Sequence, residues 1–62
     1  MSIQSELEAA GVPLQHDGST LYARMCSASI PIVVEYGLRA LIRVVVIDGE
    51  VWFFIPFAYE GN

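Results

Sequence analysis

The chain has 62 residues, one cysteine and one histidine, and its seven acidic residues outnumber its three arginines to give a formal net charge of −4. One domain over residues 1–62 is expected, and a chain this short buries only about 60% of its extended surface, so its stability margin is thin. A single cysteine excludes a disulfide within the chain, and one histidine argues against a metal site built from protein ligands alone. The acidic balance argues against a general nucleic-acid binder, which needs a basic patch.

The sequence carries no pattern typical of export or of a membrane span. Its first six residues lack the basic segment and the apolar run of a secretory signal. The most apolar stretch, residues 30–47, contains Glu35, Arg39 and Arg43, whereas a transmembrane helix needs about 20 residues with few or no charges. We therefore expect a cytoplasmic protein without membrane contact, and a single thiol agrees with a reducing compartment.

Residues 2–10 are predicted to form a short helix. Ser2 is a suitable N-cap residue, and Gly11 followed by Pro13 is typical of a helix end. The apolar positions at helical spacing are Ile3, Leu7 and Ala10. A helix of nine residues is marginal in isolation, so we expect this stripe to pack on a sheet.

Residues 12–16 and 19–26 flank the dipeptide Asp17-Gly18, which predicts a first, smaller hairpin. Strand alternation divides the second of these segments into two faces. One face carries Leu21, Ala23 and Met25, and the other carries Thr20, Tyr22, Arg24 and Cys26.

Residues 30–36 fit two kinds of element. Their β-branched and aromatic side chains favour a strand. Pro31 can instead be the first residue of a helix that Ser29 caps and that runs on towards residue 41. Gly37 would cost such a helix about 1 kcal/mol. We therefore favour a strand, with Gly37 as a bend before the next hairpin.

A long hairpin is predicted over residues 38–59, around Asp48-Gly49. Asp-Gly suits a type I′ turn, which needs positive φ at both central residues, and positions whose numbers sum to 97 then face each other. One face is wholly apolar: Leu38, Ala40, Ile42, Val44 and Val46 lie opposite Val51, Phe53, Ile55, Phe57 and Tyr59. The other face holds two arginines: Arg39, Leu41, Arg43, Val45 and Ile47 lie opposite Glu50, Trp52, Phe54, Pro56 and Ala58.

The predicted fold class is α+β, with one short N-terminal helix packed on an antiparallel sheet of about four or five strands built from two Asp-Gly hairpins. Nine helical residues span about 14 Å, whereas ten strand residues span about 34 Å. The helix is therefore too short to cover even the wholly apolar face of the long hairpin.

No catalytic residue, metal ligand or cofactor is predicted. His16 lies beside a turn and nothing in the sequence aligns it with Cys26, so neither is expected to act in nucleophilic catalysis. For Glu35, an ion pair with Arg39 or Arg43 is favoured over the role of a catalytic acid. The glycines are isolated, which excludes a phosphate-binding loop.

An interface or ligand-binding surface is predicted instead. The residues expected to form it are Arg39, Arg43, Trp52, Phe54, Tyr22 and Tyr36. Their types are those enriched in interface hot spots, and Arg43 faces Phe54 in the expected register, which suits a cation–π contact. The competing interpretations are that both hairpin faces are internal core, or that the rings stack on nucleic-acid bases, which the negative charge disfavours.

The sequence thus favours a non-enzymatic protein–protein interaction module that forms a homo-oligomer, with a dimer favoured, and acts as an accessory or inhibitory protein. Another protein is a further possible partner; nucleic acid and membranes are not. The alternative is a small-molecule binder with an apolar pocket between sheet and helix or between subunits. The expected pocket lining is Tyr22, Tyr36, Trp52 and Arg43.

Overall fold

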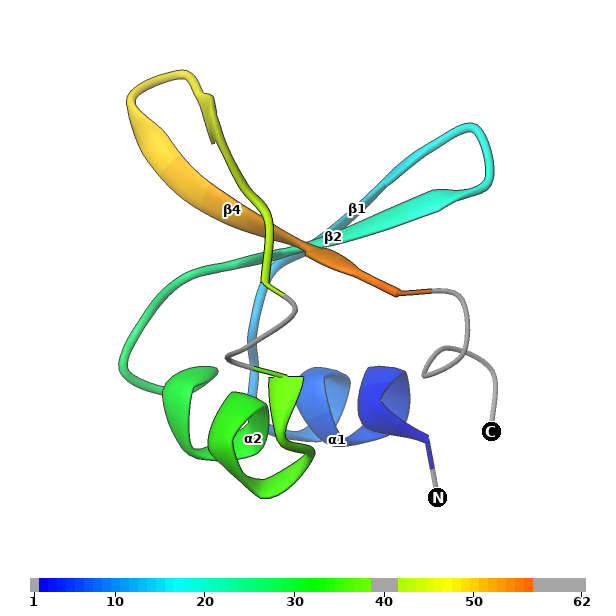
Figure 1. Ribbon diagram of the computed structural model, residues 1–62, viewed down its shortest axis with the longest axis vertical. Coiled ribbons are helices and arrows are strands. Elements are labelled where there is room, and N and C mark those ends of the chain that lie inside the picture. The colour runs from blue at the N-terminus through cyan, green and yellow to red at the C-terminus, as the bar shows by residue number, and fades with distance from the viewer. Residues whose placement is uncertain (1, 39–41, 57–62) are drawn as a thin grey trace.

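The computed structural model of the chain describes residues 2–38 and 42–56. Within these residues the elements are α1 (Ile3–Ala9), β1 (Leu14–Asp17), β2 (Thr20–Arg24), α2 (Ile30–Glu35), β3 (Val44–Ile47) and β4 (Glu50–Ile55). The strands form an antiparallel sheet in the order β1-β2-β4-β3. Both helices lie below the point where the two hairpins cross in Figure 1. The predicted α+β fold is confirmed.

Helix α1 begins at the expected cap and buries two of the three residues of the expected apolar stripe, whereas the third, Ala10, is exposed at the helix end. The backbone amide of Ser5 donates to the side-chain oxygen of Ser2, 3.1 Å away, which satisfies one of the amides that a helix start leaves free. Ile3 and Leu7 lie four residues apart on one face, and both are fully buried against the sheet.

Residues 30–35 form the second helix, so the preferred assignment of a strand is wrong. Pro31 lies in the first turn of α2, where its missing amide costs no hydrogen bond. The helix ends at Glu35, two residues before Gly37, so the glycine does not interrupt it. Val33 is buried in the core, and this tertiary contact outweighs the weak strand preference of the β-branched residues. The hydroxyl of Ser29 donates to the Cys26 carbonyl and makes no helix cap.

The first hairpin turns one residue later than the predicted Asp17-Gly18. Asp17 pairs with Thr20, so the turn consists of Gly18 and Ser19. Of these two, only Gly18 has a positive φ, of 64°, and glycine at the first central position is what a type II′ turn requires. Each residue of the first strand therefore faces a partner two positions away from the expected one. Because side chains alternate between faces, a shift by an even number keeps Leu21 and Ala23 on the expected face.

The second hairpin has the register in which position numbers sum to 97. Ile47 pairs with Glu50, and Asp48 and Gly49 both have positive φ, 51° and 79°, as a type I′ turn requires. The strands are shorter than expected, because β3 begins at Val44 and β4 ends at Ile55. Residues 39–41 and 57–59 of the predicted hairpin lie outside the described residues.

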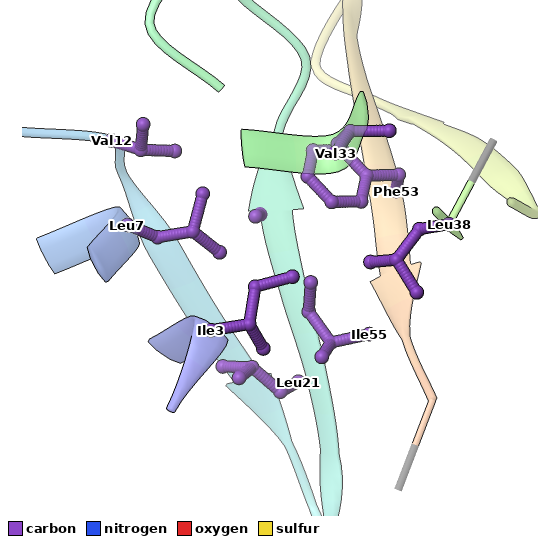
Figure 2. Packing of buried hydrophobic residues seen from close by; sticks show 9 residues of the cluster. Ile3, Leu7, Val12, Leu21, Val33, Leu38, Phe53 and Ile55 are labelled. Atoms are coloured by element: carbon purple, nitrogen blue, oxygen red, sulfur yellow. The ribbon is translucent and has the colours of Figure 1, made fainter. Parts of the chain in front are cut away.

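The core lies between the two helices and the inner face of β2 and β4, as Figure 2 shows. Its buried side chains are those of Ile3, Leu7, Val12, Leu21, Ala23, Val33, Leu38, Phe53 and Ile55. This packing does not extend to the end of the β3–β4 hairpin, which projects beyond the helices in Figure 1. On the inner face of this hairpin, three valines are consequently exposed: Val44 by 58%, Val46 by 66% and Val51 by 41%.

Candidate interaction site

The outer face of the sheet is the face turned away from α1 and α2. Residues directly opposite one another on neighbouring strands share a face. Tyr22 pairs with Phe54, and Trp52 pairs with Arg24 on one side and Val45 on the other. The pairing therefore brings three aromatic side chains together on the outer face. Within residues 2–38 and 42–56, both helices pack against the opposite face.

The two hairpins splay apart towards their turns in Figure 1, and the outer face carries two hollows. One hollow, of about 350 Å³, is lined by Gln15, His16, Asp17, Tyr22, Val45 and Ile47. A second, of about 270 Å³, is lined by Thr20, Tyr22, Arg43, Val44, Val45 and Phe54. Tyr22 and Val45 line both hollows, so the two adjoin. We call the combined depression, which runs from β1 to β3, the outer trough.

The aromatic floor of the outer trough is formed by two rings from distant parts of the sequence. The rings of Tyr22 and Phe54 meet edge to face, with their centroids 6.3 Å apart and their planes at 64°, a geometry that aromatic pairs favour. Phe54 thus contacts Tyr22, and its expected stacking with the Arg43 guanidinium is not found. Arg43 is exposed at the edge of the trough.

Trp52 is placed differently from the other predicted interface residues. It is only 9% exposed, so most of the ring is already covered within the chain. Its indole Nε1 is buried, and no hydrogen-bond partner for it is found among the described residues. A buried donor without a partner costs about 1–3 kcal/mol. Beside it, a guanidinium nitrogen of Arg24 lies 2.8 Å from a carboxylate oxygen of Glu50.

The structure separates Tyr36 from the predicted surface. Tyr36 follows α2 on the helix side of the molecule, and its hydroxyl donates a hydrogen bond to the Glu6 carboxylate of α1. The outer trough therefore brings Tyr22, Arg43 and Phe54 together, with Trp52 beside them. Tyr36 does not belong to this group, and Arg39 lies outside the described residues.

The contact between Tyr36 and Glu6 makes stability depend on pH. The hydrogen bond to Glu6 raises the pKa of Tyr36 to about 12, with smaller contributions from burial and from nearby carboxylates. Folding therefore favours the protonated phenol. Its stabilising contribution is complete below pH 10 and is lost as the pH rises from 10 to about 12. We expect Tyr36→Phe to remove this part of the pH dependence of thermal unfolding. Tyr22→Phe, the matched control, should retain it, and a loss in both variants would contradict the assignment.

Two other titratable groups, His16 and Cys26, lie far from each other. His16 pairs with Leu21 near the turn of the first hairpin, whereas Cys26 lies beyond the opposite end of β2. Burial raises the pKa of the Cys26 thiol, but hydrogen bonds from Ser29 and Ala28 and the charge of Arg24 together lower it below its ordinary value. Glu35 is exposed and forms no ion pair with Arg43.

Core side chains occupy the space between the helices and the sheet, where the alternative interpretation places a ligand pocket. Both hollows lie on the outer face instead. Among the described residues, no three His, Cys, Asp or Glu side chains lie close enough together to hold a metal ion. In the same part of the chain, no helix is long and apolar enough to cross a membrane. Comparison with family models, with curated proteins and with solved structures finds no match to the chain.

Proposed function

We propose that the chain is a non-enzymatic protein–protein interaction module, that it forms a homo-oligomer, with a dimer favoured, and that it acts as an accessory or inhibitory protein. The supporting observation is the amount of apolar surface that the described residues leave uncovered. The outer trough presents Tyr22, Val45 and Phe54, and Val46 is exposed on the opposite face of β3 together with Val44. Apolar surface left uncovered in this way is typical of sites that another protein covers.

The composition of the trough supports a protein partner in particular. Tyrosine, phenylalanine, tryptophan and arginine are enriched where proteins meet, and a polar rim around an apolar centre is the usual arrangement. Here the aromatic floor is bordered by Gln15 and Asp17 on one side and by Arg43 on another. Covering this surface would also give a short chain the additional burial that its size demands.

The test of this proposal is the absolute mass in solution, measured by light scattering over a dilution series. A dimer should have twice the 6.8 kDa mass of one chain. We expect that mass at high concentration, with a decline towards one chain on dilution. A mass of one chain at every concentration would contradict the self-association.

A further inference from the structure

The two edges of the sheet differ in how they are protected. In the order β1-β2-β4-β3, the outermost strands are β1 and β3. Strand β1 is preceded by Pro13 and carries exposed polar side chains at Gln15, His16 and Asp17. Proline and charged or polar side chains are common means of preventing an edge from pairing with another chain. Strand β3, Val44–Ile47, consists of four β-branched apolar residues and has none of these protections.

The backbone groups on the open side of β3 can be identified from the pairing with β4. The amide of Phe54 donates to the carbonyl of Arg43, 2.9 Å away. In an antiparallel pair the groups that bond to the partner strand alternate along the chain, so Val45 and Ile47 also point towards β4. The amides and carbonyls of Val44 and Val46 consequently point away from the sheet. No hydrogen bond to them is found from any other described residue.

We propose that β3 pairs antiparallel with β3 of a second copy of this chain, around a two-fold axis that passes between the Val45 residues of the two copies. The proposal rests on the self-association proposed above and names the surface that forms it. The sheet then continues from one subunit into the other. Such a contact is isologous, because the same residues contribute from both sides.

The register of this pairing follows from two conditions. Residues that face each other must share a face of the sheet, so their numbers must sum to an even number. The bonded pairs must also use the outward groups of Val44 and Val46. Both conditions hold when Val44 faces Val46 of the second copy and Val45 faces Val45, which gives four backbone hydrogen bonds. A shift of this register by two in either direction leaves only one of these valines with a valine partner. The other valine then faces residue 42, before the strand begins, or residue 48, in the turn.

Side chains and charges favour a second copy as the occupant. Val44 and Val46, exposed by 58% and 66%, would face each other in two symmetric pairs on the inner face of the sheet, beyond the part that the helices cover. In the same register, Arg43 lies opposite Ile47 of the second copy, next to the turn that carries Asp48 of that copy. The exposed cation of each subunit thus approaches an acidic turn of the other. Val45 lines the outer trough, so the troughs of the two subunits meet at the axis.

Disulfide trapping tests the register directly. Residues of a non-hydrogen-bonded antiparallel pair have Cα atoms about 4.5 Å apart, within the range of a disulfide. We expect Val45→Cys, in a chain that also carries Cys26→Ser, to form a covalent dimer on mild oxidation. Val44→Cys and Val46→Cys, in the same background, should each crosslink poorly alone and readily when mixed. Failure of Val45→Cys to crosslink, or equal crosslinking of all three alone, would overturn the proposal.

Val46→Pro tests whether the edge holds the dimer. It removes an amide that bonds to no other described residue but that the pairing requires. We expect a folded variant with half the mass of the wild-type dimer, whereas Glu8→Ala, on the exposed side of α1, should keep the dimer. A dimer that survives Val46→Pro would overturn the edge pairing while leaving self-association intact. A wild-type monomer throughout the dilution series would overturn both. If Val46→Pro does not fold, by far-ultraviolet circular dichroism, the crosslinks decide.

Discussion

Phe53→Ala should bring the domain to the margin of unfolding or beyond it. Phe53 is fully buried on the inner face of β4, in the cluster that both helices share. Truncating a buried phenylalanine costs about 3–5 kcal/mol, from lost burial and from the cavity that remains. At 0.05–0.15 kcal/mol per residue, the whole stability of a 62-residue chain is only about 3–9 kcal/mol. Urea and thermal unfolding, followed by circular dichroism, measure the loss.

Val51→Ala is the matched control for this variant. Val51 lies two residues before Phe53, on the same strand and the same face, but it is 41% exposed because the helices do not reach it. Its truncation should cost under about 1 kcal/mol, since little burial is lost. Equal losses in the two variants would show that the core extends to the end of the hairpin, contrary to the packing described here.

The elements that follow from sequence are those specified by neighbouring residues. Helix α1 has its cap at Ser2 and its buried residues within a seven-residue segment. The neighbouring residues alone therefore predict where the helix starts and which side is buried. The register of β3 and β4 depends on Asp48 and Gly49, which lie between the two strands they join. In both cases the decisive contacts link residues close in the chain.

Helix α2 shows where local preference is insufficient. Its residues individually favour strands. Val33 nevertheless packs in the core with Phe53, and the short helix α2 places it there. The pattern of Ser29, Pro31 and Gly37 was compatible with a helix. Gly37 does not oppose this helix, because α2 ends before reaching it.

The outer trough depends on a pairing between distant segments. Tyr22 meets Phe54 because β2 lies beside β4, and these two residues are 32 positions apart. The alternation of side chains in the sequence correctly predicts the face of its own hairpin on which each residue lies. It does not predict which strands of different hairpins pair with each other. The same limitation explains Tyr36: residue type alone groups it with the other aromatic residues, whereas the fold holds it against Glu6.

Leu7→Ala is expected to have the second-largest effect, because α1 depends on the sheet for its existence. A helix of seven residues is unstable in water by itself. Leu7 and Ile3 are its two fully buried side chains, and the Leu7 carbonyl also accepts the amide of Val12, 3.0 Å away. Removing the Leu7 side chain should cost about 2–5 kcal/mol.

The expected consequence is detachment of α1 together with weakening of the whole domain, since Leu21 and Ile55 beneath it would be exposed to water. Hydrogen exchange should show lost protection at the amides of α1 and reduced protection in β2 and β4. Glu8→Ala is the control, because Glu8 is exposed on the same helix and alanine favours helices at least as well. Unchanged protection in β2 and β4 of Leu7→Ala would mean that the sheet is stable without α1. The uncovered inner face would then be a second apolar surface, and the mass of this variant in solution would rise above that of the wild type.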